Sequence, residues 1–204
     1  MTPPRPLASQ SDRSRKVRLS GLLFAAVIAA SPVFAQTGEQ RIPVCLACHG
    51  AGGTAQLPGT PSLGAQPADY VLVQLYLFRE KQRVVAPMNA MAEGLTDDDL
   101  RTVSDAISKL PPPTPASDAL DAATLERGQA LAAKHRCGSC HNADFSGHDQ
   151  IPRLAGQRED YLRKSLIDYK SNSRSGYDAT MNELTQEVPD AEIPVLAKYL
   201  SHYK

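Results

Sequence analysis

The apolar residues of this chain recur mainly at helical spacing. One apolar band extends from Tyr70 to Leu77 and ends at the charged run 79–81, and a similar band extends from Tyr161 to Tyr169. Apolar positions three and four residues apart lie on one face of a helix, so each band predicts an amphipathic helix. No stretch of useful length alternates between apolar and polar residues. We therefore predict an all-α fold.

Three shorter segments add helices to this prediction. Thr96 and the three acids that follow it are typical of a helix start, because threonine caps free backbone N–H groups and acids are favoured in the first turn. In the second half of the chain, the segment Pro189–Glu192 predicts the start of a corresponding helix. Residues 125–134 predict a further short helix.

The predicted helices belong to a repeat. The motif Cys45-Leu-Ala-Cys48-His49 recurs 92 residues later at 137–141, as Cys-Gly-Ser-Cys-His, and these four cysteines are all that the chain contains. A second motif, Pro-x-Leu-x-x-Gln-x-x-x-Tyr, starts at Pro61 and again 91 residues later at Pro152. Because the offsets drift so little, they indicate a duplicated domain with small changes in the loops.

A proline-rich segment separates the two copies. Residues 111–115 include four prolines. Such a segment cannot continue a helix and favours an extended chain. We predict a first domain at residues 36–110, a linker at 111–117 and a second domain at 118–204.

The N-terminus predicts export. Residues 1–18 carry five basic side chains against one acid, and an apolar run of 12 residues follows from Leu19 to Ala30. This length suits the hydrophobic region of a signal peptide and is short of the roughly 20 residues needed to cross a bilayer. The sequence Val33-Phe34-Ala35 predicts cleavage after Ala35, which gives a periplasmic protein without a membrane span in its mature form. The alternatives are an uncleaved anchor and a buried N-terminal helix.

Removing residues 1–35 changes the charge of the chain. The precursor has 22 basic and 22 acidic side chains, and this balance argues against a nucleic-acid binder. The remaining 169 residues carry 17 basic and 21 acidic side chains, a net charge of −4. Only 5 % of the residues are aromatic and none is Trp. A core built from the side chains of this chain alone would therefore contain few large aromatic residues, and we expect a bound group to fill part of it.

Each cysteine pair with its histidine predicts a covalent haem. The motif Cys-x-x-Cys-His attaches c-type haem, because two thiols on one helical turn bond the two vinyl groups while the adjacent His reaches the iron. The predicted attachment residues are Cys45 and Cys48 for the first haem and Cys137 and Cys140 for the second. The alternatives are a disulfide, a redox-active dithiol and a zinc site. Zinc pairs are usually 15 to 20 residues apart rather than about 90.

Counting methionines suggests the second axial ligands. A low-spin haem takes Met or His opposite its proximal histidine. Met88 follows His49 by 39 residues and Met181 follows His141 by 40, so we predict these four residues as the iron ligands. Met91 is the runner-up in the first copy. The competing histidines, none of which has a histidine counterpart in the first copy, are His135, His148 and His202.

These motifs together resemble the tandem class I dihaem cytochromes c, specifically the cytochrome c4 type. The resemblance covers essentially the whole chain after residue 35. It implies two small helical domains related by a pseudo-twofold axis, with the haem propionates near their interface. It also implies that the backbone carbonyls of Pro61 and Pro152 accept a hydrogen bond from His49 and His141, which orients each ring and raises its basicity.

The function expected from these features is electron transfer without catalysis. Six-coordinate iron leaves no open position for a substrate, and no catalytic residue is required. The expected partners are redox proteins, namely a terminal oxidase, a cytochrome bc complex or a dehydrogenase, with peripheral membrane association compatible with such a role. The alternatives are a cytochrome subunit of a flavin- or quinone-dependent periplasmic dehydrogenase and a dihaem peroxidase or sensor.

Overall fold

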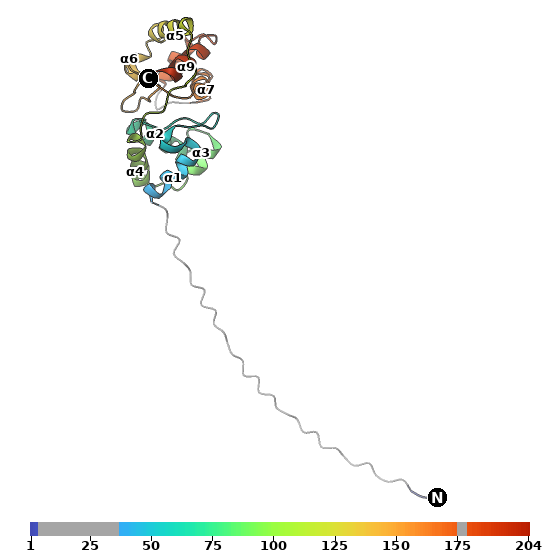
Figure 1. The fold of residues 1–204 in the computed structure, drawn as a ribbon. Coiled ribbons are helices and arrows are strands. Elements are labelled where there is room, and N and C mark those ends of the chain that lie inside the picture. The colour runs from blue at the N-terminus through green and yellow to red at the C-terminus, as the bar shows by residue number, and fades with distance from the viewer. Residues whose placement is uncertain (4–36, 175–178) are drawn as a thin grey trace. The chain divides into compact units, whose positions relative to one another are not determined.

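Helices make up the regular structure of the described chain (Figure 1). The computed structural model describes residues 1–3, 37–174 and 179–204. Within these ranges the isolated bridge between His148 and Ile151 is the only pairing of extended chain, so the all-α prediction is confirmed. The elements are α1 (Gly38–His49), the 3-10 turn η1 (Ala51–Gly53), α2 (Ala68–Arg79), α3 (Ala86–Ala92), α4 (Asp97–Ser108), α5 (Ala122–Lys134), α6 (Gly138–His141), α7 (Glu159–Lys170), α8 (Thr180–Gln186) and α9 (Ile193–His202).

The first half packs α1 and α2 against α4, and α3 against α2. Helix α4 begins where the sequence predicts, because the Thr96 side chain accepts a hydrogen bond from the Asp99 N–H while the Asp99 carboxylate accepts one from the Thr96 N–H. Its buried face carries Leu100, Val103 and Ile107, which lie in a core cluster with apolar residues of α2 and α3.

The second half repeats this arrangement with α5 and α7 against α9, and α8 against α7. The predicted helix start at Pro189–Glu192 is one turn too early, because residues 190–192 form a turn and α9 begins at Ile193. Conversely, α5 begins three residues before the predicted Leu125, where the Asp121 carboxylate caps the Thr124 N–H. The core cluster of this half is built on α9.

The linker is attached to the second half. Residues 111–117 have no regular secondary structure. The Ala116 N–H donates to the Ser201 carbonyl at 3.0 Å, and just after the linker the Asp118 carboxylate lies 2.9 Å from Nε2 of His202. The two cores lie in one compact unit that ends at Lys204, and the predicted domain boundaries stay a prediction.

The predicted signal peptide covers residues 1–35 with cleavage after Ala35; all of it except residues 1–3 lies outside the described residues. In the described ranges, no helix has the length and apolarity that a membrane crossing needs.

Candidate haem sites

In the first half, the histidine of the motif ends a helix and is held by a backbone carbonyl. His49 is the last residue of α1, and its Nδ1 lies 2.7 Å from the carbonyl oxygen of Pro61. Because that oxygen can only accept, Nδ1 carries the proton and Nε2 keeps a free lone pair. Gly50 follows with a φ of 85°, and a Cβ there would lie 1.9 Å from the Thr54 carbonyl oxygen. Only glycine therefore fits the turn that leads the chain away from His49.

The second half places its histidine in the same way with a different turn residue. Nδ1 of His141, at the end of α6, lies 2.8 Å from the Pro152 carbonyl oxygen. Asn142 takes the place of Gly50 with a φ of 66°, and its side-chain amide donates to Ser146 Oγ and to the Gly147 carbonyl. These two bonds hold Asn142 at a φ of 66° and a ψ of 158°, a backbone conformation that residues other than glycine rarely adopt.

Burial keeps both histidines in the form that binds iron. Each side chain is only 6 % exposed. Desolvation lowers the pKa of His49 and of His141 below the ordinary value, although the proline carbonyls act in the opposite direction. The rings are therefore neutral near pH 7, each with its Nε2 lone pair available to a metal.

None of the four cysteines is paired in a disulfide. Cys45 and Cys137 are half-buried, and burial raises the pKa of both, whereas Cys48 and Cys140 are exposed. In the described residues no group of three or more His, Cys, Asp or Glu side chains is close enough to hold a metal ion. Each cysteine pair beside a histidine fits a haem c.

The predicted methionine ligands occupy equivalent positions. Met88 is in α3 and packs against the first core, whereas Met91 is exposed. Met181 is half-buried in α8. These placements favour Met88 over Met91, and the ligand roles of Met88 and Met181 stay a prediction.

The competing histidines each have a carboxylate partner. The nearest ring nitrogen to carboxylate oxygen distance is 2.6 Å for His135 with Glu192 and 2.9 Å for His148 with Asp149. His202 pairs with Asp118, the first residue of the predicted second domain. Each of these three rings therefore has a carboxylate partner in the structure, and their exclusion as iron ligands stays a prediction.

Two asparagines missed by the sequence analysis support the methionines. Asn89 directly follows Met88, and its side-chain amide donates to the carbonyls of Phe78 and Arg83. Asn182 directly follows Met181 and donates to Tyr169 and Arg174 in the same manner. Each asparagine thus fixes a methionine-bearing helix to the end of the preceding helix. Their equal position in the repeat was the signal that could have revealed them.

A buried cationic cluster joins the two halves. Arg174 is 6 % exposed, and its guanidinium donates to the hydroxyls of Tyr161 and Tyr70, while Arg83 donates to Tyr161 from the first half. Burial raises the pKa of Tyr161, but the guanidiniums of Arg174 and Arg83 outweigh it and lower that pKa to about 7. For Tyr70, burial and the neighbouring Tyr161 raise the pKa to about 12.

Among the described residues, the hydrogen-bond partners of the Arg174 guanidinium are hydroxyl groups and include no carboxylate. Nε of Arg174 is buried and has no hydrogen-bond partner in the described structure. An unpaired buried cation is unfavourable. The haem propionates are anions of the kind that would compensate it, so Arg83 and Arg174 fit a group that brings carboxylates to this interface.

Comparison with known proteins agrees with this geometry. A family model described as cytochrome c matches residues 125–204. A cytochrome c4 of Thiocapsa roseopersicina is 30 % identical over 177 residues, which cover 81 % of this chain and 90 % of the relative. The chain belongs to the cytochrome c4 family. A crystal structure of reduced cytochrome c4 from Pseudomonas stutzeri superposes with a TM-score of 0.72 at 26 % identity, covering 82 % of this chain and 97 % of the other.

Another relative of the present chain, from Thiomonas intermedia strain K12, is described as a thiosulfate dehydrogenase electron acceptor. It is 28 % identical, with 84 % of each chain covered. Membership of the family means that the protein carries two covalently bound haem c groups and is an electron carrier whose partners are redox proteins.

Proposed function

We propose that this protein is a periplasmic dihaem cytochrome that passes electrons between respiratory partners, for example toward a terminal oxidase. The observation that carries the proposal is the repeated pair formed by a buried histidine and a proline carbonyl, 2.7 Å apart for His49 and 2.8 Å for His141. Both histidines come directly after a Cys-x-x-Cys motif. Two equivalent sites in one chain suit a carrier that receives an electron at one and releases it from the other.

The residues of the chain set the conditions for this transfer. Haem c supplies a one-electron couple at its iron when bound. Nε2 of His49 and of His141 would hold the iron, while each proline carbonyl fixes the orientation of the ring. The thioethers of Met88 and Met181 would be the second protein ligands, and thioether ligation would favour the ferrous state. A haem held in this way would leave no position open for a substrate.

Substitution of the methionines tests this assignment. In Met181→Ala we expect one haem to lose its long-wavelength methionine-to-iron absorption band, its reduced form to bind carbon monoxide, and its midpoint potential to fall. Met88→Ala should do the same to the other haem. A redox titration followed by optical spectra counts the haems and gives both potentials.

Met91→Ala is the matched control, because Met91 is exposed and lies in the same helix as Met88. This variant should retain both bands. Retention of both bands in Met181→Ala, or loss of a band in Met91→Ala, contradicts the ligand assignment. Carbon monoxide binding by the unsubstituted reduced protein would favour the peroxidase or sensor alternative.

The second candidate is the electron-accepting subunit of a periplasmic dehydrogenase. It is favoured by the likeness to a protein described as a thiosulfate dehydrogenase electron acceptor. A subunit would copurify with its dehydrogenase in a fixed ratio at moderate salt, whereas a free carrier would elute alone.

Sequencing the N-terminus of the exported protein tests the predicted cleavage after Ala35.

The acidity of the mature chain supports a partner with a basic docking surface. Its net charge is −4 before the propionates are added. Opposite charges accelerate encounter and are screened by salt. The rate of electron transfer to the physiological partner should therefore fall as ionic strength rises.

A further inference from the structure

Two glutamines bind backbone across the boundary between the halves. Gln157, in the second half, accepts a hydrogen bond from the Ser62 N–H and donates one to the Ser62 carbonyl, both at 2.8 Å. Gln66, in the first half, makes the same pair of bonds with Arg153, both at 3.0 Å. Both glutamine side chains are only 3 % exposed. They are the glutamines of the repeated proline motif, so the contacts are reciprocal.

The N–H groups that the glutamines bind belong to particular peptide groups. The Ser62 N–H and the Pro61 carbonyl are the two ends of one planar peptide unit. His49 donates to the oxygen of that unit, and the unit donates in turn to Gln157. A single peptide group therefore joins the proximal histidine of one half to a buried glutamine of the other.

The second site has the same connection in the opposite direction. His141 donates to the Pro152 carbonyl, and the N–H of the same peptide unit, from Arg153, donates to Oε1 of Gln66. Each glutamine is thus separated by one peptide group from the histidine of the half to which it does not belong. Space-filling alone does not explain a glutamine that reaches into the other half, because an apolar side chain would fill the space without burying an amide.

Hydrogen bonds in a chain polarise one another. When Oε1 of glutamine accepts from the peptide N–H, more negative charge accumulates on the peptide oxygen, and the bond from histidine Nδ1 strengthens. A stronger bond at Nδ1 makes the imidazole a better donor to iron, which stabilises the ferric state. The buried surroundings of Ser62, which is 2 % exposed, keep water from replacing the glutamine.

We propose that Gln66 and Gln157 are crossed positioning residues, each of which tunes the haem of the opposite half through the peptide that holds its histidine. The proposal rests on the proposed roles of His49 and His141 as iron ligands. It makes each haem site complete only when the other half is docked.

Gln66→Met and Gln157→Met test this proposal, because methionine keeps the length of the side chain and removes both hydrogen bonds. In Gln66→Met the midpoint potential of the haem next to His141 should rise, with a smaller change at the haem next to His49. In Gln157→Met the pattern should reverse. Stepwise redox titration followed by NMR signals of each half separates the two potentials.

A readout that does not depend on iron ligation accompanies the potentials. In the reduced protein, the amide signal of Arg153 should shift and exchange faster with solvent in Gln66→Met, and that of Ser62 in Gln157→Met. Shifted amides with unchanged potentials, in a protein that keeps both methionine-to-iron bands, would overturn the tuning proposal alone. Absence of the bands in the unsubstituted protein would overturn the ligand assignment itself.

Ser104→Ala and Ser201→Ala are matched controls. Both hydroxyls are buried, but each donates to a carbonyl of its own helix, Leu100 and Lys198 respectively. They should leave the difference between the two potentials unchanged. A larger shift at the haem of the substituted half, equal shifts of both haems, or a comparable crossed shift in the serine controls would contradict crossed tuning.

Discussion

The two halves bring their first and last helices together over different surfaces. In the first half, Gly38 of α1 faces α4, and a Cβ on Gly38 would lie 3.0 Å from Thr102 Cβ and 3.1 Å from the Asp99 backbone. In the second half, Gly128 of α5 lies against Tyr199 of α9, where a Cβ would approach the tyrosine Cβ to 2.4 Å. A glycine thus permits close packing in both pairs, against backbone in one and against an aromatic side chain in the other.

The aromatic contact extends into a cluster that the first half lacks among its described residues. Phe145 lies edge-on to Tyr203, with ring centroids 4.8 Å apart, and Tyr199 contacts both rings. The main core cluster of this half has eleven buried apolar residues, three of them alanines, and that of the first half has eight, one of them alanine. The comparison teaches that the cofactor sites were kept while the packing behind them diverged.

The largest test removes one haem at a time. Replacing Cys45 and Cys48 by alanine, or Cys137 and Cys140, should each reduce the haem content from two per chain to one, because the thioether bonds cannot form. The first-half variant should lose more helical circular dichroism, because the described residues of the first half have no counterpart of the aromatic cluster formed by Phe145, Tyr199 and Tyr203. Haem content is measured from pyridine spectra. Equal loss of helix in the two variants would remove the proposed difference.

The two glycines provide a test of intermediate size. Gly128→Ala forces a methyl group into Tyr199, and overpacking of this kind costs about 1–3 kcal/mol. Gly38→Ala meets looser contacts, of 3.0 Å to Thr102 Cβ and 3.1 Å to the Asp99 backbone, so its cost should be smaller. Urea unfolding of both variants gives the two free energies. A cost at Gly38 as large as that at Gly128 would show that the helix pairs are equally tight.

The smallest expected effect is on the stability of the folded protein at low pH. Hydrogen bonds from Lys134 and His135 lower the pKa of Glu192 at the start of α9. A carboxylate with a lowered pKa in the folded state stabilises the protein above its ordinary pKa of about 4.3, and this contribution is lost as the pH falls through the folded value. Glu192→Gln should therefore be slightly less stable at pH 7 and show a weaker loss of stability below about pH 4.

Glu126→Gln is the control for this acid effect, because Glu126 is exposed in α5 and also removes one negative charge. Its acid unfolding curve should follow that of the unsubstituted protein. If both variants flatten the acid limb equally, the effect is one of net charge and not of the contacts of Glu192.

Sequence patterns could predict the helices and the residues that approach the cofactors, because these depend on short-range rules. Thr96 caps its helix locally, and the spacing within Cys-x-x-Cys-His is set by one helical turn. The predicted start of α9 was one turn too early, because proline and acidic residues favour a turn just before a helix as well as the first turn of the helix itself.

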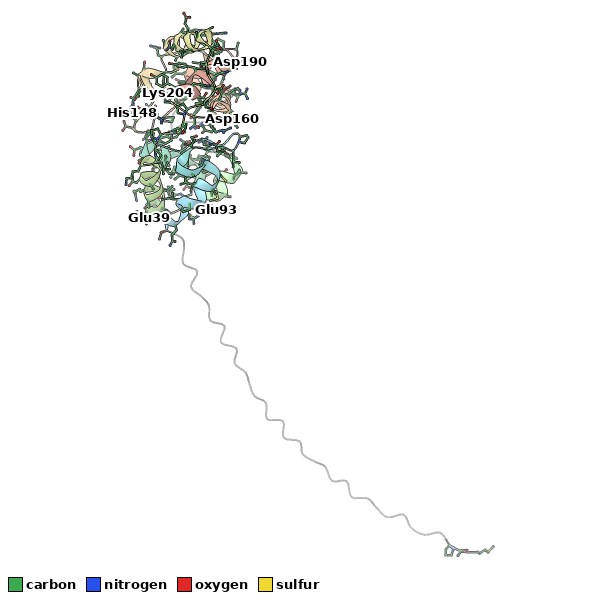
Figure 2. The ribbon with its side chains drawn as sticks, in the orientation of Figure 1. Glu39, Glu93, His148, Asp160, Asp190 and Lys204 are labelled. Carbon is green, nitrogen blue, oxygen red and sulfur yellow. The ribbon has the colours of Figure 1, made fainter. Side chains whose placement is uncertain are left out.

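The contacts between the halves could not be predicted in the same way. Gln66 and Arg153 are 87 residues apart, and Arg83 and Tyr161 are 78 apart. The repeat marks Gln66 and Arg83 as paired with Gln157 and Arg174, but a repeat does not show whether paired residues pack within their own half or across the boundary. Only the docked structure decides this, as Asp160, labelled in Figure 2, illustrates by binding the Gly59 N–H at 2.8 Å.

The glutamine contacts bear on how the two copies have been able to differ. Each glutamine binds a peptide N–H and carbonyl, which every residue except proline provides, and so it places no demand on the side chain there. The two equivalent positions accordingly hold a small serine, Ser62, and a long cation, Arg153. After duplication, mutations at these two positions could therefore accumulate independently without weakening the attachment of the halves to each other.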